Sequence, residues 1–165
     1  MKAKNIVQGA LLTALSIIIP VMFGGTLRIL IGPFSATLAS HVPVMLAMRI
    51  NPMVAGFVGV GSSLGFLVQL GPVVAARALM HVPFAVLGAI LYQKGMSFTK
   101  VLIITLPIHA IAEALIVIPF GFTLADAGFL VGVGTAVHHA IDSLIALSLA
   151  GVLSFNPRGK KVKLN

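Results

Sequence analysis

Three pairs of ionisable residues recur in the second half of the chain, each pair separated by four positions. The pairs are Arg77 and His81, His109 and Glu113, and His138 and Asp142. Residues at this spacing share one face of a helix and can contact each other. Imidazole, carboxylate and guanidinium groups can bind a polar small molecule or, in the case of imidazole and carboxylate, a metal ion. The pairs therefore predict a polar site to which several helices contribute.

The sequence around these pairs is strongly apolar. Hydrophobic residues make up 59% of the chain and charged residues only 8%, whereas about a quarter of the residues of a typical soluble domain are charged. Cysteine is absent, which excludes disulfides, thiolate metal sites and thiol nucleophiles. We therefore expect an integral membrane protein whose chemistry depends on oxygen and nitrogen side chains.

A helix needs about 20 largely apolar residues to cross a membrane. Six stretches approach this length, at residues 6–23, 34–49, 52–70, 73–92, 99–120 and 128–154, and segments rich in Gly, Pro, Asn and Asp separate them. The second stretch is short and contains Pro43. The sequence predicts an all-α integral membrane protein with six transmembrane helices, arranged as one transmembrane domain over residues 1–165.

The basic residues predict how this bundle is oriented. Six spans place both termini on one side, and nine lysines and arginines fall there: Lys2, Lys4, Arg49, Lys94, Lys100, Arg158, Lys160, Lys161 and Lys163. Only Arg28 and Arg77 fall on the other side. Because cytoplasmic loops are enriched in Lys and Arg, both termini are predicted to be cytoplasmic. The basic residues form no stripe interleaved with aromatic residues, so we expect no nucleic-acid partner.

Known catalytic motifs are missing from the sequence. The segment GVGSSLG at 59–65 lacks the Lys-Ser/Thr ending of a phosphate-binding loop, and HAIAE at 109–113 is not the His-Glu-x-x-His motif of a zinc protease. No motif distinguishes a nucleophilic serine from a packing serine. We therefore expect a protein that is not an enzyme, has no cofactor and cannot hydrolyse ATP by itself.

Ionisable side chains are costly in hydrocarbon and usually face a cavity or each other. Together the three pairs predict a polar pocket open to the outside, with walls from the spans at 73–92, 99–120 and 128–154. In an alternative interpretation each pair only links neighbouring helices. A metal site is a second alternative, because His and Asp one turn apart can both be ligands. His41, on a different span, is interpreted as structural.

Several segments resemble the substrate-binding S components of energy-coupling factor (ECF) vitamin transporters, and the similarity covers nearly the whole chain. GALLTALS at 9–16 has the alanine spacing of that family's Ala-x-x-x-Ala motif, and a long external loop follows the first span. GPFSATLASHVPVMLAMRINP at 32–52 and VVAARALMHV at 73–82 resemble the subgroup that transports hydroxymethylpyrimidine, pyridoxine or niacin.

This resemblance implies a bacterial cytoplasmic membrane protein that binds a vitamin from outside. A transmembrane scaffold (T) component and two ATPase subunits would then drive release inside. It assigns coupling to the T component to Ala10 and Ala14, and a lid to the loop around Arg28. It assigns substrate binding to six residues, of which Arg28 acts from the lid: Arg28, Arg77, His81, Glu113, His138 and Asp142. Metal-binding members use a histidine at position 2, where this chain has Lys2, so no metal ligands are assigned.

The pocket chemistry leaves the vitamin open. Arg28 and Arg77 suit the carboxylate of niacin, whereas Glu113 and Asp142 suit the protonatable nitrogens of hydroxymethylpyrimidine or pyridoxine, which we favour, with niacin next. Phe34, Met80 and Phe84 are expected to supply apolar or stacking surface. The alternatives are a channel, a small ion-coupled carrier or a metal-binding membrane subunit. A carrier is expected to show an internal repeat, and none is evident.

Overall fold

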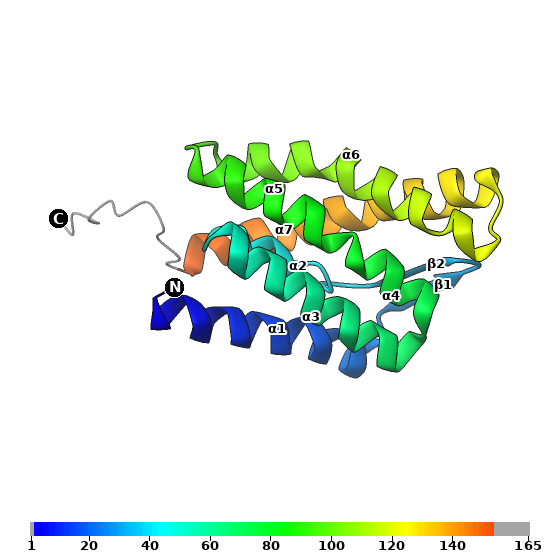
Figure 1. Cartoon of the computed structure of the whole chain (residues 1–165), viewed down its shortest axis with the longest axis horizontal. Helices are drawn as coiled ribbons and strands as arrows, with labels where there is room; N and C mark the ends of the chain where they lie inside the picture. The colour runs from blue at the N-terminus through cyan, green and yellow to red at the C-terminus, as the bar shows by residue number, and fades with distance from the viewer. Residues whose placement is uncertain (1, 154–165) are drawn as a thin grey trace.

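The computed structural model describes residues 2–153, which form a helical bundle with one short β-hairpin (Figure 1). The elements in chain order are α1 (Ala3–Phe23), β1 (Arg28–Ile31), β2 (Phe34–Thr37), α2 (Val42–Ala47), α3 (Pro52–Leu70), α4 (Pro72–Leu79), α5 (His81–Gln93), α6 (Phe98–Ile116), the 3-10 turn η1 (Ile118–Phe120), the π-helix η2 (Asp126–Val133) and α7 (Gly134–Val152).

Five helical segments of the described chain are long and apolar enough to cross a membrane: Ala3–Phe23, Pro52–Leu70, Pro72–Gln93, Phe98–Phe120 and Asp126–Val152. They match five of the six predicted spans to within a few residues. Local sequence explains several of their ends. Asn51 caps α3 by accepting a hydrogen bond from the Val54 N–H at 2.9 Å, and Pro52 follows it at the first helical position. Gly71, with φ of 83°, separates α3 from α4.

The prediction of a spanning helix over residues 34–49 is wrong. This stretch contains strand β2, an irregular segment and the short helix α2. As one helix it would rise only about 24 Å, less than the roughly 30 Å of the hydrocarbon core. An extended chain rises about 3.3 Å per residue, so the partly extended segment reaches from the hairpin at one end of the bundle to α2 near the other (Figure 1).

Helix α2 is apolar because protein surrounds it. All six of its residues are buried, and it packs against α1, α3, α5 and α7. Irregular backbone at membrane depth is tolerated only where protein buries it. Hydropathy therefore identified residues 34–49 as buried but could not distinguish burial in protein from burial in lipid.

Asp142 on α7 satisfies the backbone of this irregular segment. Its Oδ1 accepts a hydrogen bond from the Ala39 N–H at 2.8 Å, and its Oδ2 accepts one from the His41 N–H at 2.9 Å. Ala39 has a φ of 68°, a conformation that is uncommon for a residue other than glycine. One turn earlier on α7, His138 Nε2 donates to the Thr37 carbonyl at 3.0 Å. Two side chains of α7 thus replace the helical hydrogen bonds that residues 37–41 lack.

We predict that Asp142→Asn destabilises the protein. The amide replaces one acceptor by a donor, so it can satisfy only one of the two backbone N–H groups and opposes the other. A hydrogen bond to a charged group is worth about 1.5–3 kcal/mol, and the free energy of unfolding should fall by about that amount. Thermal or denaturant unfolding of the purified protein in detergent measures this change.

Asp126→Asn is the matched control, because the hydrogen bonds of Asp126 are to Thr123 at an exposed site. Its stability should remain close to that of the wild type. If Asp142→Asn unfolds like the wild type and instead loses ligand binding, Asp142 contacts the ligand and does not hold the backbone.

Candidate functional site

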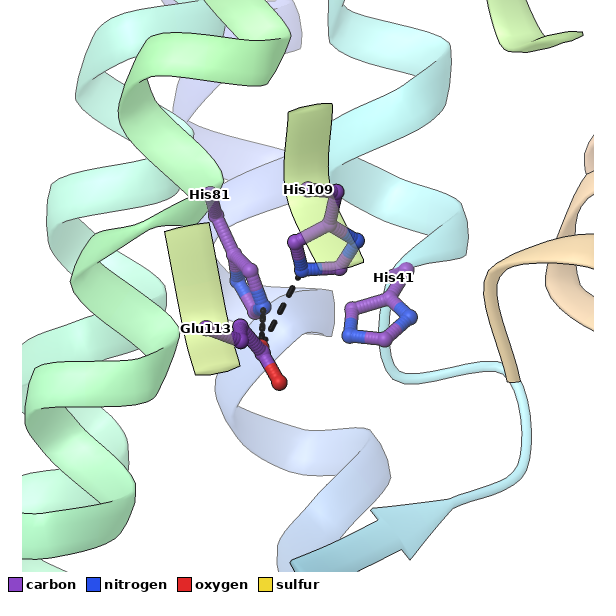
Figure 2. Close-up of side chains that lie close together, drawn as sticks. All are labelled: His41, His81, His109 and Glu113. Carbon is purple, nitrogen blue, oxygen red and sulfur yellow. Dashed lines mark hydrogen bonds and ion pairs between the residues drawn. The ribbon is translucent and has the colours of Figure 1, made fainter. Parts of the chain in front are cut away.

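Eight ionisable side chains are buried near one another in the interior of the bundle. They are His41, Arg77, His81, His109, Glu113, His138, His139 and Asp142, and they come from the segment before α2 and from α4, α5, α6 and α7. Figure 2 shows His81 and His109 directed at the Glu113 carboxylate, with the ring of His41 beside them. The structure thus brings the three predicted pairs into one cluster.

Glu113 is the centre of the first part of this cluster. Its Oε2 accepts hydrogen bonds from Arg77 Nη2 at 2.6 Å, Arg77 Nε at 3.1 Å and Thr135 Oγ1 at 2.6 Å. Its Oε1 lies 3.1 Å from His109 Nε2 and 3.6 Å from His81 Nε2. Oε2 is therefore saturated by a buried ion pair, whereas Oε1 faces two imidazoles.

Arg77 connects this cluster to the β-hairpin. Its Nη1 donates to the Pro33 carbonyl at 3.2 Å and to the carbonyl and hydroxyl of Ser35 at 3.3 Å each. Its guanidinium carbon lies 5.3 Å from the centre of the Phe34 ring, within the range of a cation–π contact. The guanidinium is thus hydrogen-bonded to the hairpin on one side and to Glu113 on the other.

Arg77 and His81 do not form the pair that their spacing predicts. The helix is interrupted at Met80 between α4 and α5, and Pro83 lacks the N–H that would bond back across this turn. Both side chains instead approach Glu113 on α6. The other two pairs do lie in contact: His109 Nε2 is 3.1 Å from Glu113 Oε1, and His138 Nε2 is 3.2 Å from Asp142 Oδ2.

His41, which the sequence interpretation set aside as structural, joins the two halves of the cluster. Its ring centre lies 4.7 Å from those of His81 and His109 and 4.2 Å from that of His138. Its Nδ1 is 3.3 Å from Asp142 Oδ2, but the geometry there is not that of a hydrogen bond, and this buried atom has no hydrogen-bond partner among the described residues.

A small, partly open pocket lies on one side of the cluster. Its polar lining comes from the hairpin side and from the cluster: Ser35, Thr37, Ser40, His41, Arg77, His81, Glu113 and His138. Its apolar lining comes from Phe66, Val74 and Ala78. A cavity with a few convergent polar groups and an apolar wall is the usual form of a small-molecule site.

The predicted site residues are distributed unequally around this pocket. Arg77, His81, Glu113 and His138 line it, whereas Asp142 lies behind His41 and His138 and Arg28 stands on strand β1 away from the lining. Phe34, Met80 and Phe84, which were expected to supply apolar surface, are not among its lining residues.

The sequence interpretation missed three polar contributors: His41, Thr135 and His139. His139 Nδ1 lies 3.0 Å from His109 Nδ1, and its Nε2 lies 3.1 Å from the Leu102 carbonyl oxygen. Their position in the sequence could have identified them, because each is a polar residue within an apolar stretch and is therefore expected to be buried. His41 was set aside because residues 34–49 were assigned to a separate helix.

No protein-family model matches this sequence, and no solved structure matches it. The niacin transporter NiaX of Lactococcus lactis subsp. cremoris is 39% identical to this chain. The alignment is 170 residues long and covers 93% of this chain and 76% of that transporter. Together with five apolar helices, this identity makes the chain a multi-pass cell-membrane protein. It belongs to the S components of the energy-coupling factor vitamin transporters.

Proposed function

We propose that this chain is the S component that binds niacin for an ECF-type importer. The observation that carries the proposal is the 39% identity to a niacin transporter over 93% of the chain. The preference for hydroxymethylpyrimidine or pyridoxine, which rested on the two acidic residues, finds no support in this relative. Both acids already have partners in the structure: Oε2 of Glu113 is paired with Arg77, and Asp142 holds backbone N–H groups.

The pocket chemistry supports a small aromatic carboxylate. Niacin is a pyridine ring with one carboxylate, and the cationic side chain of the lining is Arg77. A guanidinium can hold a carboxylate by two parallel hydrogen bonds. Phe66 and Val74 offer apolar surface for the ring, while Ser40 and His138 offer hydrogen-bonding groups at its edge. We assign carboxylate binding to Arg77, with His81, Glu113 and His138 as the remaining polar lining.

The hairpin is proposed to act as a lid through Arg77. In this structure Nη1 of Arg77 is occupied by Pro33 and Ser35. A carboxylate that takes these donors would release the hairpin from the guanidinium, so ligand binding and hairpin position would be coupled. Arg28, on the neighbouring strand β1, would contribute to this lid from the outer side and would not contact the ligand.

We predict that the purified chain binds niacin more tightly than nicotinamide, pyridoxine or hydroxymethylpyrimidine, and that Arg77→Lys removes most of its discrimination between niacin and nicotinamide. Lysine keeps the charge beside Glu113 but cannot form the bidentate contact. The loss of a charged hydrogen bond of about 1.5–3 kcal/mol corresponds to a roughly tenfold to hundredfold weaker affinity for niacin. Isothermal titration calorimetry with each compound measures these affinities.

Nicotinamide provides the internal control, because it has the same ring without the carboxylate. A merely structural defect in Arg77→Lys would weaken binding of both compounds equally. Tighter binding of pyridoxine or hydroxymethylpyrimidine than of niacin by the wild type would overturn the assignment of the vitamin.

The proposed topology has six crossings with both termini in the cytoplasm, within a single transmembrane domain. The segment from β2 to α2 would be the sixth crossing. The beginning of α1 and the end of α7 lie at the same end of the bundle (Figure 1). Arg49 belongs to that end, because its Nη1 donates to the Ala150 carbonyl near the end of α7 at 2.9 Å. Four of the counted basic residues, Arg158, Lys160, Lys161 and Lys163, lie outside the described residues.

Coupling to a T component is assigned to the outer face of α1. Ala10 and Ala14 are exposed there, together with large apolar side chains such as Leu11 and Ile18. The opposite face packs closely on α3, where a Cβ added at Gly61 would clash with Thr13 Cγ2. The two alanines therefore do not pack inside the monomer, and they leave a shallow surface that another helix can approach. Two ATPase subunits would supply the energy, and the chain itself is proposed not to be an enzyme.

We predict that Ala14→Trp abolishes niacin uptake by the complete transporter and leaves niacin binding by the isolated chain unchanged. The indole would hold a partner helix away from α1 without reaching the buried cluster. Uptake of labelled niacin into proteoliposomes and calorimetric binding measure the two effects separately.

Ala140→Trp is the matched control, since Ala140 is an exposed alanine on α7. It should retain both binding and uptake. If Ala14→Trp loses binding and stability together, or if it keeps full uptake, this face of α1 does not couple the chain to a partner.

A further inference from the structure

We propose that His41, His81, His109 and Glu113 form a binding site for one divalent transition-metal ion, best suited to zinc. One potential ligand atom from each of the four residues lies within 4.8 Å of those of the other three. All four residues are buried, and Figure 2 shows them directed at a common point from separate parts of the chain. Three imidazoles and one carboxylate are a usual donor set for zinc. The site goes beyond vitamin binding and does not depend on which vitamin the pocket takes.

The hydrogen bonds of the cluster require a cation beside Glu113. The Leu102 carbonyl can only accept, so His139 Nε2 donates to it, and a neutral His139 then accepts at Nδ1. His109 Nδ1 must donate to that atom at 3.0 Å. A neutral His109 is left with a lone pair on Nε2, which faces Glu113 Oε1 at 3.1 Å. Two acceptors at this distance repel each other unless a proton or a metal ion lies between them.

The surroundings favour a metal ion over a proton. A proton would join only His109 and Glu113, whereas a metal ion would also bind His81 Nε2, which lies 3.6 Å from the same Oε1, farther than a hydrogen bond reaches. Ligand atoms about 2.0–2.1 Å from a tetrahedral zinc ion are separated by roughly 3.3–3.4 Å. The two separations measured from Oε1, 3.1 and 3.6 Å, fall on either side of that value.

Two of the three imidazoles of the proposed site have a hydrogen-bonding partner at the other nitrogen, and the third, His41, has a carboxylate near its Nδ1 outside hydrogen-bond geometry. His109 Nδ1 contacts His139, His81 Nδ1 lies 3.3 Å from Ser62 Oγ, and His41 Nδ1 lies 3.3 Å from Asp142 Oδ2. Metal-binding histidines almost always have such a partner, which fixes the ring and its tautomer. Glu113 is likewise fixed through Oε2 by Arg77 and Thr135, and its Oε1 remains for the metal.

A second group of donors, His41 with His138 and Asp142, is also compact. It is the weaker candidate because the potential ligand atoms of His138 and Asp142 already form hydrogen bonds. Both oxygens of Asp142 accept backbone N–H groups, and His138 Nε2 donates to the Thr37 carbonyl. A metal ion there would have to break the contacts that hold residues 37–41.

The test uses the full chain, purified in detergent, stripped with a chelator and checked for intact folding by circular dichroism. Zinc is added, and metal bound after dialysis is counted by mass spectrometry. Cobalt(II) serves as a spectroscopic probe, because a tetrahedral site gives intense visible absorption. We expect one bound ion per chain and a tetrahedral cobalt spectrum. His81→Asn should lower zinc affinity about a hundredfold or more, since losing a second-shell partner alone costs 10–100-fold.

The variants are chosen to keep the fold. In His81→Asn the amide can still reach Ser62, because Asn places a polar atom where Nδ1 stood, while the Nε2 ligand is lost. His138→Gln, the control, keeps a donor for the Thr37 carbonyl and should bind zinc like the wild type. The proposal is overturned if the folded wild type binds no stoichiometric ion, if His81→Asn binds as tightly as the wild type, or if His138→Gln is the variant that loses the metal.

Discussion

The arrangement of this protein depends on one constraint: in a membrane, every backbone N–H needs a partner within the protein. Helices satisfy their own, but residues 38–41 are not helical. Asp142 accepts the N–H groups of Ala39 and His41, and His138 donates to the Thr37 carbonyl. The pair on α7 therefore makes an irregular passage possible inside the bundle. That passage carries His41 into the centre of the polar cluster.

Most of the bundle could be predicted from hydropathy because five of its segments are helical, apolar and long enough to cross a membrane. The stretch at 34–49 could not, because the apolar side chains of α2 face other helices. Hydropathy indicates that a segment is buried, but it does not show whether protein or lipid surrounds the segment. The residues before α2 are extended, so each of them covers more distance than a helical residue does. The stretch can therefore cross the bundle although it is too short to do so as a helix.

The candidate site could be predicted to the level of helix faces. A spacing of four residues placed His109 beside Glu113 correctly, since both stand on the uninterrupted part of α6. It failed for Arg77 and His81 because the helix is interrupted at Met80. Partners on other helices, such as Thr135 for Glu113, depend on how the helices are rotated against each other. No periodicity within one segment contains that information.

The charges of the cluster link the two proposals. Arg77 is neutralised by Glu113, and Asp142 adds one further negative charge, so with neutral imidazoles the buried groups sum to a negative charge. A niacin carboxylate entering the adjacent pocket would increase that charge in a medium that screens it poorly. A proton held between His109 and Glu113 would neutralise the negative charge of the cluster only while no ligand is bound. A divalent ion at Oε1 of Glu113 would balance both Asp142 and the incoming carboxylate. For niacin, the proposed ligand, electrostatics therefore favours a site that already holds the metal ion when the vitamin binds.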